Sequence, residues 1–407
     1  MNVINIYENS SYTLNKNYID EFKQFLKDHK DLPMVLQGET IIFDSYTIGS
    51  IRVKDLTINI LPRISKLSVN HYLEMQLYNE GLLDEKISSL LGENESFGMQ
   101  ENLIDLFLKE TFDLVSHGVE GDFVKVTEVT NQIRGKILVD KISPLNLLQD
   151  QIPIEYEVHT LNTSYNKIVK LALDKVRILG KKAKHIKLHA LANSYFDEID
   201  VDTTDLPLLL QQNAEKMYFE NEKYPIVLGL AEKILKDLKI NLKSNQVTSS
   251  SYLVNSNHLF EKYVRKVLLN HLKLNVTKWD QPKPMGKFKV GSNEYIKSFS
   301  PDIMIDYHHD TNSAFAVLDA KNKDISNHKK IGELSDLYQL LFYCYALNSS
   351  YGGLIYPYYG NLQPIRIHVD SFKEANIFAF SVDFSKPMKE RNKLLSDSIK
   401  STFHLLD

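Results

Sequence analysis

The chain has 407 residues, too many for one typical core, which indicates two or three domains. The apolar fraction of 43% and the charged fraction of 25% are those of soluble globular proteins and exclude a mainly disordered or fibrous chain. The net charge is −4, but from Ser251 onward 20 Lys and Arg stand against 16 Asp and Glu, so the C-terminal part is better suited to meet phosphate groups.

No segment is apolar enough to be a membrane span, which takes about 18 to 20 consecutive apolar residues. The stretch Met1–Asn17 also lacks the basic and then apolar segments of a secretory signal. We therefore expect a cytoplasmic protein without a membrane partner. The single cysteine, Cys344, rules out an internal disulfide and a cysteine-based zinc cluster, and its apolar surroundings predict a buried thiol.

Residues 1–160 are predicted to form a strand-rich α+β N-terminal region. In Leu56–Ile64 apolar residues alternate with polar ones, which is the pattern of a strand with one buried face. The other elements expected here are strands in Met34–Phe43, a pair of strands in Val119–Val139, and helices at Ile19–Lys30, Val69–Asn79 and Glu101–Val115.

Residues 161–245 are predicted to form a helical middle region. Apolar residues recur three and four positions apart, as at Ile168, Leu171 and Ala172 and again between Val227 and Leu238. The polar stretch that follows, 243–251, ends in three consecutive serines and is predicted to be a linker.

Residues 251–407 alternate between helix and strand, which predicts an α/β domain with a mixed central sheet flanked by helices. Helices are expected at Asn257–Leu272, Ser335–Leu347 and Ser385–Phe403, and strands near Val276, Tyr295, Ile303 and Ala316 and at Gly353–Tyr356, Ile365–Val369 and Ile377–Val382.

Two apolar strands of this domain, joined by a hydrophilic turn, predict a β-hairpin with acidic residues at one end. Asp302 stands near the start of the first strand and Asp319 near the end of the second, so the hairpin brings both carboxylates to the same end of the sheet. Lys321 shares a face with Asp319 because it follows two residues later. Metal-dependent cleavage of a phosphodiester needs hard oxygen ligands and a nearby positive group, and these three side chains supply both.

Other interpretations of these residues stay open. Asp302 and Asp319 could cap strand ends, with Lys321 as a solvated edge residue. Asp306 could replace Asp302 as a metal ligand, although it stands toward the turn.

The arrangement resembles the PD-(D/E)xK nuclease superfamily. The segment Leu259–Val264 is similar to the helix that contributes an acidic residue in that family, here Glu261. The segment Asp336–Tyr343 resembles the helical Q-x-x-x-Y element, with Gln339 and Tyr343 on one helix face. An ordinary surface glutamate and plain helix packing are the alternatives for these two segments. The resemblance implies an endonuclease domain in which Asp302, Asp319, Glu261 and the backbone carbonyl of Ala320 hold Mg²⁺, or Mn²⁺ in its place, and in which Lys321 and Gln339 complete the catalytic set.

Short motifs along nearly the whole chain resemble the McrC family, the nuclease subunits of McrBC (5-methylcytosine-specific) restriction systems. They are Ile58–Ile64, Ile133–Ile137 and Leu161–Ile168, followed by the nuclease segment. The resemblance implies DNA as the substrate and an McrB-like AAA+ GTPase hexamer as the partner, which the region 1–160 docks on and stimulates. The chain itself has no G-x-x-x-x-G-K-[ST] motif, so any motor is another chain. The basic loop with Arg134 and Lys136 is the candidate ring contact, with an ordinary basic turn as the alternative.

The expected function is therefore that of an Mg²⁺-dependent endodeoxyribonuclease in an anti-phage restriction complex, active with its motor partner. Two other functions stay open: a non-catalytic subunit that grips DNA and activates the partner, and a stand-alone repair or recombination nuclease. Because the partner reads the base in McrBC-type systems, the sequence does not fix which DNA sequence or modification is recognised, or whether methylated or unmodified DNA is cut.

Overall fold

The computed structural model describes residues 2–83, 98–179, 183–201, 208–209, 219–243, 246–370 and 375–405. The chain divides into two compact units, one made of Met1–Asn102 and Lys239–Asp407 and the other of Leu103–Leu238. These limits differ from the expected boundaries at 160 and 245, because the second unit begins earlier and the chain returns to the first unit at Lys239. None of the helices in the described residues is long and apolar enough to cross a membrane.

A five-stranded mixed sheet organises the N-terminal part of the first unit. Its order is β1 (Asn2–Tyr7), β6 (Leu56–Leu61), β5 (Thr47–Val53), β11 (Gln246–Asn255) and β10 (Lys239–Lys243). In β6 the alternation seen in the sequence is confirmed, because Leu56, Ile58 and Ile60 are buried. The amphipathic helix α1 (Lys16–Asp28) buries Phe22 and Phe25 in the same core, beside a small sheet of β2 (Ser11–Thr13), β4 (Thr40–Phe43) and β3 (Met34–Gln37).

The predicted linker at 243–251 was wrong. Ser249, Ser250 and Ser251 lie in β11, at most 1% exposed, and pair antiparallel with β5. A serine run favours loops in most contexts, but small hydroxyl side chains also fit where a strand is covered on both faces. The consequence is that β11 completes the N-terminal sheet and leads directly into the C-terminal domain.

The second unit consists of a helical body and a projecting β-structure. The body contains α3 (Met99–His117, whose first residues lie in the first unit), α5 (Ser164–Leu179), α6 (Ala183–Asn193) and α8 (Tyr224–Asp237). The apolar spacing near Ile168 and Val227 is confirmed, because α5 packs against α8 through these buried faces.

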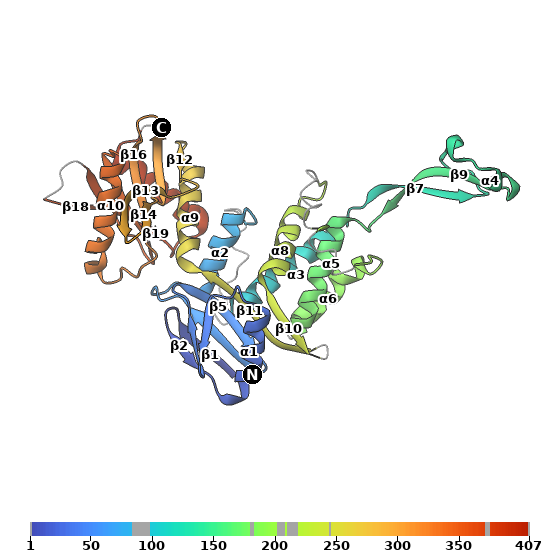
Figure 1. Cartoon of the computed structure of the whole chain (residues 1–407), viewed down its shortest axis with the longest axis horizontal. Helices are drawn as coiled ribbons and strands as arrows, with labels where there is room; N and C mark the ends of the chain where they lie inside the picture. The colour runs from blue at the N-terminus through green and yellow to red at the C-terminus, as the bar shows by residue number, and fades with distance from the viewer. Residues whose placement is uncertain are drawn as a thin grey trace. The chain divides into compact units, whose positions relative to one another are not determined.

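The projecting β-structure, residues 122–160, is called the arm below. The long strands β7 (Asp122–Thr130) and β9 (Ile152–Thr160) pair antiparallel over their whole length, and the arm also contains β8 (Lys136–Ile137) and α4 (Pro144–Leu148). The two strands expected within Val119–Val139 are confirmed as β7 and β8, and both pair with β9. Figure 1 shows the arm extending from the helical body of its unit.

The C-terminal domain is the expected mixed α/β sandwich. Its sheet runs β12 (Val276–Thr277), β15 (Ile303–His308), β16 (Ser313–Ala320), β17 (Tyr351–Tyr358), β19 (Asn376–Asp383) and β18 (Ile365–Ile367). Helix α10 (Leu334–Ala346) packs on β16 and β17, whereas α9 (Ser256–His271) and α11 (Met388–Phe403) pack on each other and on β16 and β19 respectively. Figure 1 shows α10 and α9 on either side of the sheet.

A separate two-stranded ribbon interrupts this domain between β12 and β15. It consists of β13 (Lys283–Val290) and β14 (Asn293–Phe299), pairs only with itself, and is called the 283–299 hairpin below. The sequence had indicated one strand here, near Tyr295.

Candidate functional site

The strands β15 and β16 bring Asp302 and Asp319 together, as the hairpin pattern predicted. The two strands are antiparallel, with Ile303 opposite Leu318, so the residues just outside that pair stand side by side. One carboxylate oxygen of Asp302 accepts a hydrogen bond from the backbone N–H of Ala320 at 3.1 Å, which fixes the side chain across the end of β16. The side chain of Asp319 is almost completely buried, at 1% exposure.

Lys321 points back toward Asp319, as expected for residues two apart on a strand. Its Nζ lies 2.5 Å from Oδ2 of Asp319 and donates a hydrogen bond of 2.8 Å to Oε1 of Gln339. The amide of Gln339 in turn donates to the hydroxyl of Tyr343 at 2.7 Å, one helical turn along α10. Gln339 and Tyr343 therefore form a hydrogen-bonded pair beside the lysine, and the Tyr343 ring also packs in the core of the domain.

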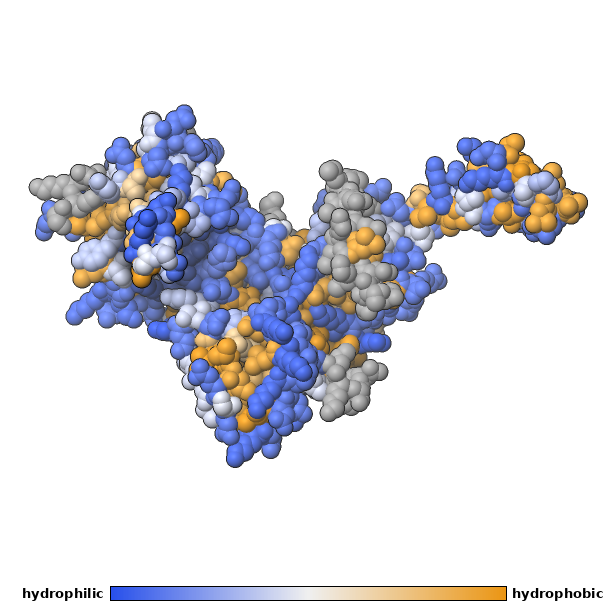
Figure 2. Space-filling view, in the orientation of Figure 1, coloured by the Kyte–Doolittle hydropathy of each residue, from blue (hydrophilic) through white to orange (hydrophobic). Residues whose placement is uncertain are grey.

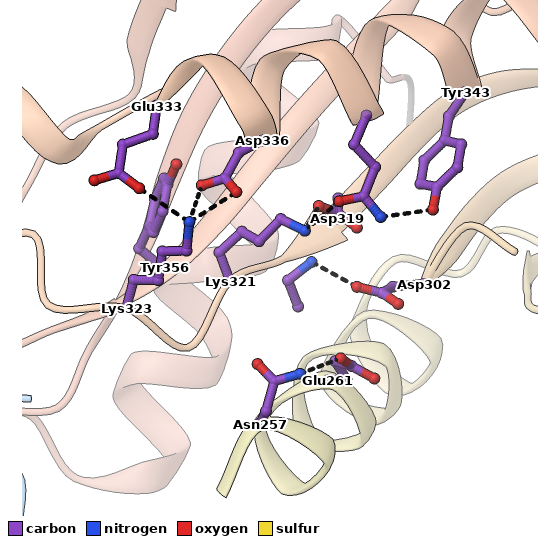
Figure 3. A network of polar contacts seen from close by, with 12 residues as sticks. Asn257, Glu261, Asp302, Asp319, Lys321, Lys323, Glu333, Asp336, Tyr343 and Tyr356 are labelled. Atoms are coloured by element: carbon purple, nitrogen blue, oxygen red, sulfur yellow. Dashed lines mark hydrogen bonds and ion pairs between the residues drawn. The ribbon is translucent and has the colours of Figure 1, made fainter. Parts of the chain in front are cut away.

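Glu261 reaches the same place from α9, on the other side of the sheet edge. Figure 3 shows its carboxylate below those of Asp302 and Asp319, with the Lys321 side chain extending toward them. The Asn257 amide donates a hydrogen bond of 2.6 Å to Glu261, and this contact holds the glutamate against its own helix. The structure thus gathers all the side chains that the sequence singled out for this site.

Burial and mutual repulsion disturb the protonation of these acids. Burial, followed by the charge of Asp302, raises the pKa of Glu261 from 4.5 to about 7. Burial and the nearby Asp302 carboxylate also raise the pKa of Asp319, although Lys321 acts in the opposite direction. Crowded carboxylates of this kind are the usual environment of a bound cation, because the cation removes the repulsion that would otherwise keep them protonated.

The donor set fits a hard divalent cation, with one restriction. Within the described part of the chain, no group of three or more His, Cys, Asp or Glu side chains is arranged to hold a metal ion. The carboxylate of Asp302 lies close enough to Asp319 and to Glu261 that its charge raises the pKa of both. Mg²⁺ needs only one or two carboxylates because it keeps several waters. Among the described residues, Oδ2 of Asp319 accepts no hydrogen bond of ordinary geometry and has Lys321 as its ion-pair partner, so a cation would complete its environment.

Asp306, the alternative ligand, lies elsewhere. Its carboxylate accepts a hydrogen bond from the backbone N–H of Asn275 at 3.2 Å, and its φ of 48° places it in the left-handed region beside the turn. Cys344 is buried as expected, and burial raises the pKa of its thiol to about 12.

The sequence analysis missed several cations around the site. Lys278 lies 3.8 Å from the Asp302 carboxylate. Lys323 contacts both oxygens of the buried Asp336 at 2.8 Å and so joins the segment after β16 to the start of α10 (Figure 3). In retrospect, the spacing of these residues indicates that the two segments contact each other. Lys321 and Lys323 share one face of an extended segment, and Asp336 and Gln339 share one face of a helix.

A model of the family described as "McrBC 5-methylcytosine restriction system component" matches residues 44–357, which is more than half of the chain. The chain belongs to this family. The expectation of an McrBC-type protein is therefore confirmed, and the matched range includes Glu261, Asp302, Asp319 and Gln339.

Solved structures similar to this McrBC component come from Thermococcus gammatolerans. A chain in a structure described as a refined half-complex of a tetradecameric assembly of McrB AAA+ hexamers with bound McrC superposes with a TM-score of 0.68 and 20% identity, over 98% of this chain and 100% of that chain. A chain of a cryo-EM structure of the McrBC complex from the same organism superposes with a TM-score of 0.50 and 20% identity, over 67% and 89% of the two chains. At this identity the likeness establishes the fold. No curated protein sequence matches.

A buried polar relay in this McrBC component links the N-terminal sheet to the site. Glu8 accepts a hydrogen bond of 2.7 Å from the hydroxyl of Ser256, the first residue of α9. The amide of Asn322, next to Lys321, donates to the same hydroxyl at 3.0 Å, and the Tyr72 hydroxyl of α2 (Val69–Glu80) donates to Asn322 at 2.9 Å. The relay therefore ties the strand that carries the lysine and the helix that carries Glu261 to one fixed frame.

Proposed function

We propose that this chain is the McrC-type nuclease subunit of a restriction complex and that it hydrolyses DNA phosphodiesters at the site of Asp302, Asp319 and Lys321. The observation that carries the proposal is the convergence of the buried Asp319 carboxylate, the partly buried Asp302 carboxylate and one lysine at the same end of adjacent strands, in a member of the McrBC family. The arrangement is that of a PD-(D/E)xK centre. A purely structural ion pair does not account for the second carboxylate and the glutamate beside it.

The residues would divide the work as follows. Asp302, Asp319 and the backbone carbonyl of Ala320, with Glu261 nearby, would hold Mg²⁺, which supplies a polarised water and a counter-charge for the phosphate. Lys321 brings a fixed positive charge to the place where negative charge develops on the scissile phosphate. Gln339 keeps the Lys321 ammonium oriented, so that the ammonium does not have to reorient during the reaction. The carboxylate of Glu261, with its raised pKa, is suited to accept a proton from a bound water.

The arm is the proposed contact with an McrB-like AAA+ GTPase hexamer. Its end exposes large apolar side chains, seen as orange atoms along the arm in Figure 2, and isolated chains rarely expose so many together. They include Val139 at 72%, Leu145 and Leu147 at 62% and Leu148 at 84%.

The two basic residues proposed for the ring contact lie on this arm. Arg134 stacks on the ring of Tyr156 at 3.8 Å and pairs with Glu128 at 2.8 Å, so it is presented in a fixed orientation, whereas Lys136 is exposed on β8.

The test of the nuclease assignment is DNA cleavage by the full-length chain with an McrB-like AAA+ partner, GTP and Mg²⁺. Asp319→Asn is expected to abolish cleavage while DNA binding and the stimulation of GTP hydrolysis persist. Asp306→Asn removes the same charge from the neighbouring strand outside the site and is expected to cut normally. Equal cutting by the wild type and Asp319→Asn would overturn the assignment.

The docking assignment has a separate readout. Leu147→Ser combined with Leu148→Ser is expected to remove stimulation of the partner's GTP hydrolysis, whereas Leu394→Ser, an exposed leucine of α11, is expected to have no effect. Stimulation that survives the double substitution would place the contact elsewhere.

A further inference from the structure

The 283–299 hairpin has no packing role that explains its surface. Apart from Phe299 at its base, the residues of β14 are exposed, and so are nearly all those of β13. Its exposed apolar side chains include Val290 at 60%, Ile296 at 56% and Met285 at 54%. The segment carries four lysines and one glutamate, so a charged ligand on it would be an anion.

The base of the hairpin is anchored beside α10, the helix that carries Gln339. Phe299 packs edge-on against Phe342 of α10 with ring centroids 5.1 Å apart and against Trp279 at 5.3 Å. Lys283 at the other strand's base lies 4.1 Å from the Trp279 ring centroid and donates to the Tyr307 hydroxyl at 2.6 Å. Asp302 follows three residues after Phe299, so the ribbon emerges from the edge of the site with a fixed direction.

The two faces of the ribbon differ in chemistry. Phe288 and Tyr295 are opposite each other in the ladder and stack with centroids 5.3 Å apart, with Lys297 lying over Phe288 at 5.7 Å. The other face carries Lys287 and Lys289. The stacked aromatic pair stiffens the ribbon across its strands, and the lysines are distributed along both edges.

The dimensions suit a DNA groove. At about 3.3 Å per residue, the eight residues of β13 extend roughly 25 Å from the base. The major groove is about 12 Å wide and admits a two-stranded antiparallel ribbon, with phosphates along both of its rims.

We propose that the 283–299 hairpin is a DNA-binding element that lies in the major groove of the duplex and contacts its phosphates through Lys287, Lys289 and Lys297. The inference rests on the proposed function for the identity of its ligand. A ribbon fixed at the edge of the site would position the duplex there before the AAA+ partner exerts any force on the DNA.

The experiment measures binding of a fluorescein-labelled 30-base-pair duplex by the full-length chain in EDTA, so that no cleavage intervenes. The test variant combines Lys287→Ala, Lys289→Ala and Lys297→Ala. The control combines Lys386→Ala, Lys389→Ala and Lys393→Ala, three exposed lysines at and just before α11, and it is well matched because Lys386 is ion-paired with Glu390 as Lys287 is with Glu294.

The test variant is expected to weaken binding roughly 10-fold or more at about 0.1 M salt. The slope of log Kd against log salt is expected to fall by about 1 for each lysine that contacts a phosphate. A third variant with arginine at the three positions is expected to restore binding, and unchanged melting temperatures show that all variants fold. Equal losses in the test and control variants, or no loss in either, would overturn the proposal.

The outcome is independent of the cutting assignment. If Asp319→Asn cuts like the wild type but the hairpin lysines still control binding, the nuclease site has failed and the hairpin stands. If Asp319→Asn is inactive and the lysine variant binds normally, the hairpin has failed alone.

Discussion

The Lys321 ammonium contacts the buried carboxylate of Asp319 and the side-chain amide of Gln339. The contact with the amide is the weaker of the two, and removing it tests how much the orientation of the lysine matters. In the proposed reaction Gln339 would contribute no charge and would act by holding the lysine toward Asp319. Its contribution is therefore one hydrogen bond to a charged group, worth about 1.5 to 3 kcal/mol.

Gln339→Ala is expected to lower the rate of cleavage by the complete complex by about 10- to 100-fold if that free energy is lost in the transition state. Stability should change little, because the residue lies on the partly exposed side of α10. Tyr343→Phe removes only the hydroxyl that positions Gln339, so its effect on the rate should be smaller. Single-turnover cleavage by the two variants gives the comparison, and a larger effect of Tyr343→Phe would contradict the assigned order.

The crowded carboxylates also predict how stability depends on pH. Because the folded-state pKa of Glu261 is raised from 4.5 to about 7, the folded protein binds more protons than the unfolded chain between those values. Without metal, the free energy of unfolding should therefore fall as the pH rises through that window. Mg²⁺ should stabilise the protein more at pH 8 than at pH 5.5, because it binds the ionised acids.

Melting temperatures in EDTA and in Mg²⁺ across this range test that expectation. Glu261→Gln removes one of the titrating groups and should flatten the fall in EDTA. A metal-free protein whose stability rises from pH 5 to pH 7, or a Glu261→Gln profile identical to the wild type, would contradict the linkage.

At the level of elements, an ion pair one turn before Gln339 attaches α10 to the segment that follows β16. Asp336 is 4% exposed and accepts from Lys323 with both oxygens, while Lys323 is partly open to solvent. Asp336→Ala leaves the lysine without its main partner and should lower the free energy of unfolding by about 2 kcal/mol, less than for a fully buried pair. Urea denaturation measures this.

The matched comparison is Glu390→Ala, which breaks an exposed pair with Lys386 and should cost less than about 0.5 kcal/mol. If the two variants were equally stable, Asp336 would not secure α10.

The elements of the site could be predicted because their signals are local. The spacing of Asp302, Asp319 and Lys321 on two apolar strands fixes their relative positions through ordinary hairpin geometry. Glu261 and Gln339 were assigned to the site through the resemblance to known nucleases. The periodicity of a helix does not indicate which sheet edge the helix covers. The role of Lys278 depends on a contact between distant elements and carries no local signal, whereas Lys323 is indicated only by its spacing from Lys321, once the position of α10 is known.

The arrangement of the domains was harder to predict for the same reason. The strand that contains Ser249, Ser250 and Ser251 pairs with β5, almost 200 residues earlier in the chain. Its sequence is polar like that of a linker, because the residues that bury this strand belong to other parts of the chain. In the arm, β7 and β8 were predicted but their partner β9 was not, because β9 lies beyond the nearest turn.

At the scale of the first unit, a buried ion pair joins α2 to α11. Arg391 is 2% exposed and donates to Glu74 at 2.6 Å and to the Tyr263 hydroxyl at 2.8 Å. Glu74→Ala leaves a buried guanidinium without its carboxylate, so it should lower the free energy of unfolding by about 3 to 5 kcal/mol.

Replacing both partners, Glu74→Leu with Arg391→Met, should recover much of that loss, because no charge then remains buried. Denaturation of both variants distinguishes the cost of an unpaired buried charge from the cost of lost packing contacts. A double substitution as unstable as Glu74→Ala would contradict it.

The position of β11 in the chain has a consequence for synthesis on the ribosome. The N-terminal sheet lacks two of its strands until Lys239–Asn255 has emerged, and all the acidic residues of the site are made after that point. The nascent protein can therefore complete this scaffold before the residues of the proposed site are made. On the proposed function, a chain released by a stalled ribosome before Asp302 would have no site at which to cut DNA.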